Sequence, residues 1–181
     1  MRSGVGLRHL VLVLGDQLDR DASAWDGFDP SQDAVWMAEV IEESTHVWSS
    51  KQRCAVFLSA MRHFAQTLSE QGVPLHYRKL DDPHNAGTLA AELETTLRRL
   101  QPQRLRLTQP GDWRVLQALH ATAQRCRVPL DVVEDRHFLC TGALFAAHAK
   151  GRKSLRMEYF YREMRRRHDV LMDGEQPLGG A

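Results

Sequence analysis

The chain has 181 residues, of which 43% are hydrophobic and 26% charged, and these ordinary globular values argue against wholesale disorder. Its length predicts one domain, or one domain with an appendage. The formal net charge of +1 gives no overall electrostatic reason to expect a polyanionic partner.

The first predicted strand is the aliphatic run at positions 10–14, which is short and leaves no polar face. Such strands are buried on both sides in parallel sheets, where ligands bind beyond the carboxyl ends of the strands. Gly15, Asp16 and Gln17 follow directly and offer close backbone approach, a charge, and an amide donor and acceptor. A Gly-Asp pair after a strand is also a common turn, so both interpretations stand. The loop at 19–32 is of the kind that often covers a cleft.

A second buried strand is predicted at 34–38, and acidic side chains follow it as they follow the first strand. Glu39 and Glu43, with His46 close behind, would lie at the same sheet edge, where carboxylates can orient hydroxyl or ring N–H donors of a ligand. Equally, Glu42 and Glu43 fit the solvated first turn of a helix, where the helix dipole favours acids.

The rest of the body alternates helices with strands. A helix is predicted over 51–71, because apolar residues at 57, 61, 64 and 68 recur at helical spacing. The further predicted elements are a strand at 74–80, a helix at 89–100 capped by Asn85 or Thr88, a strand at 104–108, a helix capped by Asp112, and a strand at 128–133. This rhythm predicts an α/β fold, a doubly wound five-stranded parallel sheet, with a C-terminal basic helical extension.

The tail differs in charge from the body. Positions 150–167 hold eight Lys or Arg and two Glu, an excess of six, whereas the remainder holds sixteen bases and twenty-one acids. A helix here would place Met157, Phe160, Tyr161 and Met164 on one face, beside the basic residues. That face can dock on a partner or approach phosphates, or it can be a packing face with solvated charges.

Several classes of function are disfavoured. The chain has no dinucleotide-binding fingerprint, P-loop, nucleophile elbow or H-E-x-x-H motif, so we predict no catalytic residues. Cys54, Cys126 and Cys140 are far apart, which argues against a disulfide framework or a closed zinc site, and no metal ligands are predicted. Residues 1–9 do not look like a secretory signal and no apolar run is long enough to span a membrane, so we expect a cytoplasmic protein without membrane contact.

The sequence resembles the photolyase-related branch of the cryptochrome/photolyase family, the iron–sulfur bacterial cryptochromes and (6-4) photolyases. The resemblance is collinear over nearly the whole chain, but it covers only the N-terminal portion of a full-length member. The segments that carry it are LGDQL at 14–18, EV at 39–40, SAMRHFA at 59–65, DD at 81–82, NAG at 85–87, PGDWRV at 110–115, GRKS at 151–154, MEYFYREMR at 157–165 and DGEQP at 173–177.

The resemblance implies a Rossmann-like antenna domain over 8–138 that binds 6,7-dimethyl-8-ribityllumazine. The implied cofactor-binding residues are Gly15, Asp16, Gln17, Glu39, Glu43 and His46. The segment 139–181 is then a helical linker that would lead into an absent domain, which in full-length relatives holds FAD, a [4Fe-4S] cluster and lesion-bearing DNA. Light absorbed by the antenna excites the reduced flavin, which donates an electron to the DNA lesion. This chain alone is therefore expected to be non-catalytic.

An alternative function remains open beside the antenna role. In it, the chain is a standalone α/β module that uses its basic aromatic helix to bind a protein or nucleic acid. The same helical tail is also a candidate surface for self-association.

Overall fold

The structure is a computed structural model that describes residues 6–179. By its internal contacts the chain divides into two compact units, one ending at Glu134 and the other beginning at Asp135. Each unit is described by itself.

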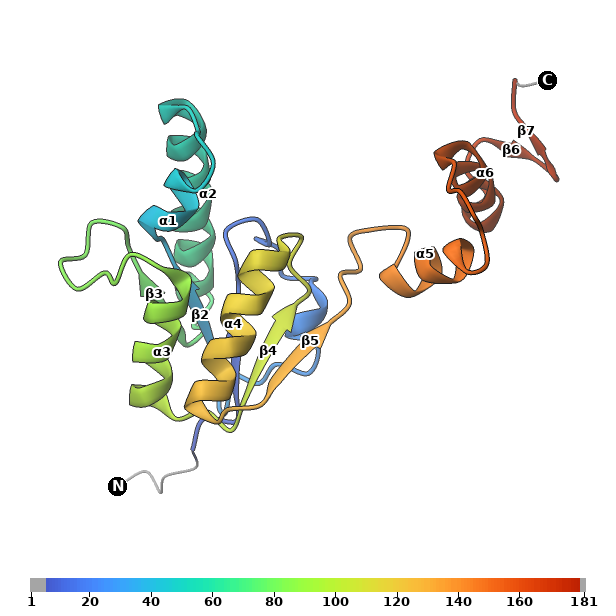
Figure 1. Cartoon of the computed structure of the whole chain (residues 1–181). Coiled ribbons are helices and arrows are strands. Elements are labelled where there is room, and N and C mark those ends of the chain that lie inside the picture. Colours follow the sequence, from blue (N-terminus) through green and yellow to red (C-terminus); the bar gives the residue numbers. More distant parts are fainter. Residues whose placement is uncertain (1–5, 180–181) are drawn as a thin grey trace. The chain divides into compact units, whose positions relative to one another are not determined.

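The first unit is built on a parallel sheet with the strand order β3-β2-β1-β4-β5, which confirms the predicted fold class (Figure 1). The chain winds outward from β1 to β3 on one side and continues from β4 to β5 on the other. The strand order therefore reverses between β1 and β4, and such a reversal is where open α/β sheets bind ligands. The strands are β1 (His9–Leu12), β2 (Ala34–Ala38), β3 (Leu75–Arg78), β4 (Arg104–Thr108) and β5 (Leu130–Val133).

Helices cover both faces of this sheet (Figure 1). Successive side chains of a strand point to opposite faces, so Leu10 and Leu12 of β1 pack in one apolar cluster while Val11 and Val13 pack in the other. The first cluster includes leucines of α3 (Leu89–Leu100) and α4 (Trp113–Cys126), and the second includes residues of the 3-10 helix η1 (Ser23–Trp25) and of α2 (Lys51–Glu70).

Side-chain caps fix where the helices begin. The Thr88 hydroxyl accepts from the Ala91 N–H and caps α3, so Thr88 rather than Asn85 is the cap. Asn85 instead donates to the backbone carbonyl oxygens of Glu39 and Lys79. The cap predicted at Asp112 is confirmed for α4. These caps hold the loops that follow the carboxyl ends of the strands.

Helix α2 is longer than its contact with the sheet. Its buried residues are Met61, Ala65 and Leu68, all in the C-terminal half, whereas Phe57 is 36% exposed and Phe64 is half-buried. The predicted apolar face is therefore correct only in its C-terminal half. The N-terminal half has no buried residue, because the helix continues past the point where the strands end (Figure 1).

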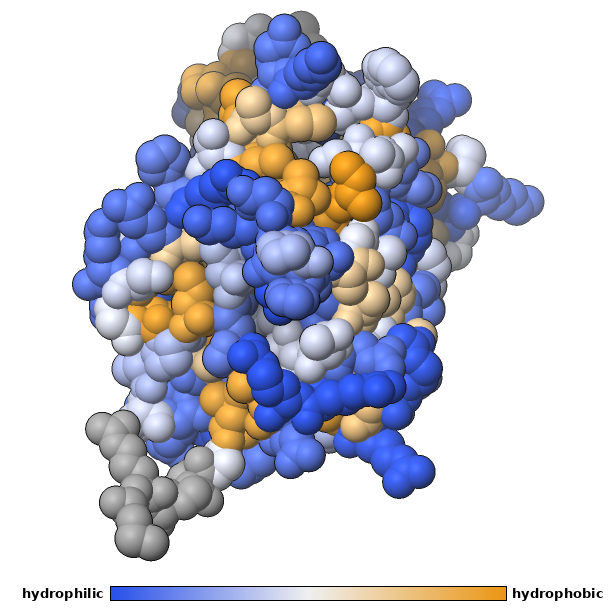
Figure 2. Space-filling model, turned by 90° about the vertical axis from the view of Figure 1, so that its left-hand side faces the viewer, coloured by the Kyte–Doolittle hydropathy of each residue, from blue (hydrophilic) through white to orange (hydrophobic). Residues whose placement is uncertain are grey.

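Exposed apolar side chains gather near that end of the first unit. Ile41, Val47, Trp48 and Val56 are each at least half exposed, and all lie between the start of the short helix α1 (Ile41–Thr45) and the first turns of α2. On the face shown in Figure 2, apolar residues form separate patches among hydrophilic ones. No helix within residues 6–179 combines the length and apolar character needed to cross a bilayer.

A buried hydrogen bond joins the sheet to α3 and supports a stability prediction. The Trp36 indole N–H donates to the Thr96 hydroxyl at 3.1 Å, and both residues are buried. Thr96→Val is expected to lower the free energy of unfolding by about 1–3 kcal/mol, because the buried indole N–H loses its acceptor. Thr95→Val is the matched control. Both threonine hydroxyls donate to the backbone carbonyl oxygen four residues earlier, but Thr95 is exposed and does not accept from Trp36. Urea denaturation of both variants measures the difference, and equal losses would contradict the role of Thr96.

The second unit consists of two helices and a short hairpin. The predicted tail helix begins at residue 157, within the basic segment 150–167. Helix α5 (Gly142–Ala149) falls in the segment 139–181 that was expected to be helical, although no separate helix was predicted there, and the hairpin was not predicted. Phe160 of α6 contacts Phe145 and His148 of α5 edge to face, and His148 is the one buried residue among those described in this unit. The elements are α5 (Gly142–Ala149), α6 (Met157–His168), β6 (Met172–Asp173) and β7 (Gln176–Pro177).

Candidate functional site

A cavity of about 250 Å³ lies in the first unit, where β1 and β4 end. Small-molecule sites usually occupy roughly 300 to 1,000 Å³, so this cavity is just below the usual range. Its wall combines apolar and polar side chains from the turns after both strands and from all the helices of this unit except η1. The lining residues are Leu14, Gly15, Asp16, Glu43, Ser44, Ser49, Arg53, Cys54, Phe57, Leu89, Pro110, Asp112 and Val115.

Gly15 lets α2 approach the end of β1 closely. A Cβ atom at this position would lie 2.6 Å from Phe57 Cε1 and 2.9 Å from Met61 Sδ, both of which are too short for ordinary contact. The missing side chain therefore leaves room for the Phe57 ring, which forms part of the cavity wall.

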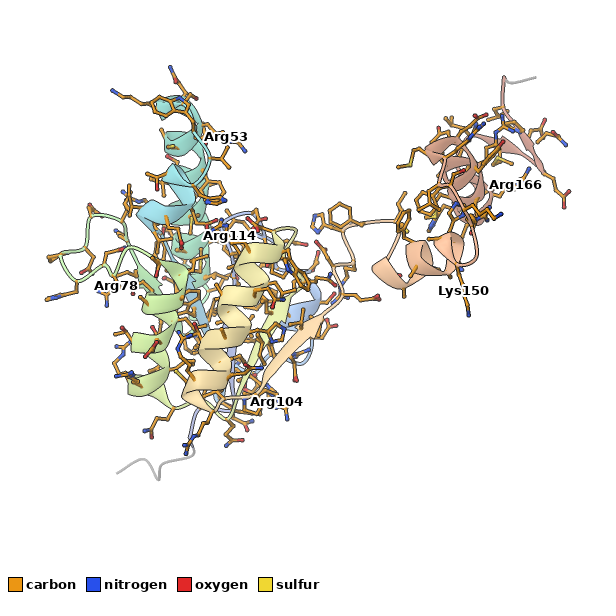
Figure 3. The ribbon with its side chains drawn as sticks, viewed as in Figure 1. Arg53, Arg78, Arg104, Arg114, Lys150 and Arg166 are labelled. Carbon is orange, nitrogen blue, oxygen red and sulfur yellow. The ribbon has the colours of Figure 1, made fainter. Side chains whose placement is uncertain are left out.

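Asp16 and Arg53 bring unpaired charges to the wall. Asp16 is exposed in the turn after β1, and Arg53 is exposed near the N-terminal end of α2, where Figure 3 labels it. Within the described residues, neither side chain makes an ion pair or a hydrogen bond. Both are therefore available to a ligand.

Arg114 joins α1 to the start of α4 beside the cavity (Figure 3). Its Nη2 atom lies 3.3 Å from Glu43 Oε1 and 3.2 Å from Asp112 Oδ2. Burial alone would lower the pKa of Arg114, but these carboxylates outweigh it and raise the pKa. Asp112 also accepts the backbone N–H groups of Arg114 at 2.7 Å and of Val115 at 3.4 Å, and these bonds hold the Asp112 pKa below its ordinary value. Glu43 thus lies in the first turn of a helix and also lines the cavity.

Glu39 does not line the cavity, contrary to the expectation from its place after β2. Its side chain is fully buried, and each carboxylate oxygen accepts two hydrogen bonds from the protein. Oε1 accepts from Arg62 Nε at 2.8 Å and from the Tyr77 hydroxyl, and Oε2 accepts from Arg62 Nη2 and the Leu80 N–H, both at 2.8 Å. A ligand would have to displace one of these partners.

The direction of the Glu39 side chain follows from the pleat of β2. Val35 and Met37, four and two residues earlier, pack on the α2 face of the sheet, so Glu39 points to the same face and meets Arg62. Burial alone would raise the Glu39 pKa, but the bonds from Arg62, Tyr77 and the Leu80 N–H hold it below its ordinary value. Glu39 therefore joins β2, β3 and α2 structurally.

Gln17 and His46 also lie outside the cavity lining. Gln17 Nε2 donates to the carbonyl oxygens of Thr108 at 3.1 Å and Gln109 at 3.2 Å, which ties the turn after β1 to the end of β4. Its Oε1 atom is buried and accepts no hydrogen bond within residues 6–179. His46 is exposed at the C-terminal end of α1.

The structure thus brings Gly15, Asp16 and Glu43 together at the cavity and separates Gln17, Glu39 and His46 from it. Arg53 and Arg114 were not predicted as site residues, and Asp112 was predicted only as a helix cap. In the described part of the chain, no three His, Cys, Asp or Glu side chains converge as metal ligands would.

Comparisons of the sequence with known proteins identify a family model and a relative to which this chain is similar. A family model described as deoxyribodipyrimidine photo-lyase-related protein matches residues 11–181. A (6-4) photolyase from Agrobacterium fabrum is 44% identical over 174 residues, which is 96% of this chain and 34% of that protein. The chain therefore spans about a third of the length of the curated relative that it matches.

Proposed function

Because this chain belongs to the deoxyribodipyrimidine photo-lyase-related protein family, we propose that its first unit is a light-harvesting module that binds an antenna chromophore in the cavity where β1 and β4 end. The proposed chromophore is 6,7-dimethyl-8-ribityllumazine, which absorbs light when bound. FAD, the [4Fe-4S] cluster and DNA belong, in this proposal, to other parts of full-length relatives. The cavity residues bind and orient the chromophore and carry out no chemical step.

The observation that carries the proposal is the unpaired Asp16 carboxylate beside the Phe57 ring in one cavity. A carboxylate accepts hydrogen bonds from hydroxyl and ring N–H groups, and a ribityllumazine offers both. The partly exposed Phe57 ring provides a flat apolar surface against which a heterocycle can pack. The position of the cavity, at the reversal of strand order, is the usual ligand site of such sheets.

Titration of the purified chain with 6,7-dimethyl-8-ribityllumazine tests the proposal. We expect saturable binding that changes the fluorescence of the ligand, and a protein that absorbs in the near-ultraviolet to violet when it is produced with a supply of the ligand. A mass spectrum of the co-purified small molecule identifies it. A colourless protein that does not bind the added ligand would contradict the proposal.

Asp16→Ala is expected to weaken chromophore binding by about 1.5–3 kcal/mol, which is the usual contribution of a hydrogen bond to a charged group. This corresponds to a dissociation constant raised by roughly ten- to 150-fold. Glu70→Gln is the control, since Glu70 is exposed in the last turn of α2, away from the cavity lining. Unchanged affinity in Asp16→Ala would remove Asp16 from the site.

A second candidate function concerns the second unit. A surface groove there is lined by Arg152, Arg162 and Arg166 together with Tyr159, His148 and Glu163, and Figure 3 labels Arg166. Exposed guanidinium groups beside an aromatic ring are suited to a protein or nucleic-acid partner with phosphate or carboxylate groups. Salt-sensitive binding of a fluorescent DNA duplex by the chain, lost in Arg162→Ala/Arg166→Ala, would favour this function.

A further inference from the structure

We infer that the cavity selects an uncharged, hydroxyl-bearing ligand and discriminates against the phosphate ester of that same ligand. The inference rests on the proposed function, because it concerns the ligand of the same cavity. It specifies the chemical class of chromophore that the cavity binds and the residues that determine this preference.

The charge of the cavity wall is negative on balance. Asp16, Glu43 and Asp112 line the cavity, against Arg53 as the cation. Arg114 lies beside them but is already shared by Glu43, Asp112 and, at 3.8 Å, Glu42. Together these groups comprise four carboxylates and two guanidinium groups, a formal charge of minus two. A phosphate monoester adds about −1.5 to −2 charges at neutral pH, so it would be repelled.

The backbone N–H groups at the start of α4 that could bind a phosphate already have an acceptor. Helix N-termini at this edge of an α/β sheet commonly bind phosphate through free backbone N–H groups. Here the Asp112 carboxylate takes the N–H groups of Arg114 and Val115. A phosphate would have to displace a resident anion of the same sign, while the neutral end of a polyol would not. The Arg53 N–H of α2 is likewise taken, by the Ser50 hydroxyl at 3.2 Å.

Hydroxyl groups match the same wall. An ionised carboxylate only accepts hydrogen bonds, and a hydroxyl supplies one donor to it. Asp16 has no partner within the described residues, so a ligand hydroxyl would satisfy it without removing an existing bond. Arg53 is the group that would favour a phosphate, but it is a single cation against three lining carboxylates, and solvent screens all four of these exposed side chains alike.

The test compares two probes, 6,7-dimethyl-8-ribityllumazine and the ester that carries a phosphate on the end of its ribityl chain. Their fluorescence titrations with the whole chain, at neutral pH and low salt, give two dissociation constants. We expect the ester to bind at least about tenfold more weakly, because the added charges meet the negative wall. High salt should narrow that ratio, because it screens the repulsion.

The variant Asp112→Ser tests whether the Asp112 carboxylate causes the weaker binding of the phosphate ester. Serine caps a helix about as well as aspartate but carries no charge, so α4 keeps its start while the wall loses an anion and Arg114 loses a partner. We expect the ratio between the two dissociation constants to fall several-fold in this variant and to stay unchanged in Glu70→Gln. An ester that binds the unmodified chain as tightly as the parent compound overturns the inference alone. Failure of the parent compound to bind overturns the proposed function and, with it, the inference.

Discussion

Arg62→Met is expected to lower the free energy of unfolding of the first unit by about 3 kcal/mol, the lower end of the usual cost of breaking a buried ion pair. The Glu39 carboxylate is fully buried, so without the Arg62 guanidinium it retains only the Tyr77 hydroxyl and the Leu80 N–H. The lower end applies because the Arg62 side chain itself is 42% exposed and already partly hydrated. Methionine keeps the apolar part of the arginine side chain, so the loss of unfolding free energy measures the effect of removing the guanidinium charge.

The pH dependence of this loss has a definite sign. In the unmodified chain the Glu39 pKa is lowered, so the pair stabilises the fold above the ordinary carboxyl pKa, and this contribution is lost as the pH falls through the folded pKa. Without Arg62, the largest cause that lowers the Glu39 pKa is lost while burial still raises it, so the Glu39 carboxylate of the variant is less stabilised at neutral pH. The two chains should therefore differ most at neutral pH and least in acid.

Urea denaturation at neutral and acid pH measures both effects. Arg98→Met is the matched control, because Arg98 pairs with Glu94 one turn away on α3 and its side chain is 76% exposed. Such surface pairs contribute about 0.3–0.5 kcal/mol. Similar losses in both variants, or a difference independent of pH, would contradict the account of Glu39.

The sequence was sufficient for the sheet because β1 and β2 belong to short apolar runs, β4 alternates polar and apolar residues, and each main helix has a regular apolar face or a polar cap. It was insufficient for α5, whose eight residues, GALFAAHA, are apolar nearly all round and so show no helical period. The hairpin of β6 and β7 has two residues in each strand, which is too short for any alternation to show.

Three of the six predicted site residues line the cavity, and one rule accounts for them, namely that parallel strands end at a common edge. That rule brings Gly15, Asp16 and Glu43 to the cavity wall. It does not say which face of the sheet a side chain takes, and the pleat turns Glu39 toward α2, where Arg62 lies 23 residues further along the chain. The positions of Arg53 and Phe57 depend on how far α2 extends past the strands, which helical periodicity cannot show.

The contact between Gly15 and Phe57 gives the second large prediction. Gly15→Ala is expected to destabilise the first unit by about 1–3 kcal/mol, the usual cost of an added atom in a packed site. The new Cβ would meet the Phe57 ring and, less closely, the Sδ atom of Met61. The nearer Phe57 ring, which is partly exposed, is displaced, so the cavity changes shape and chromophore affinity should fall. Gly111→Ala is the control, because no atom lies within 4 Å of an added Cβ there.

A double-mutant cycle tests whether the destabilisation by Gly15→Ala comes from the contact of the new Cβ with the Phe57 ring. Phe57→Leu removes the ring atoms that the new Cβ would meet, so Gly15→Ala/Phe57→Leu should be destabilised by less than the sum of the single variants. Additive losses would instead place the strain on Met61 or on the backbone. We expect the double variant to regain stability but not chromophore affinity, because the flat surface for the heterocycle is lost with the ring. Recovery of stability without recovery of affinity would show that the Phe57 ring has two separate effects. It limits how closely α2 approaches Gly15, and it provides the surface on which the chromophore packs.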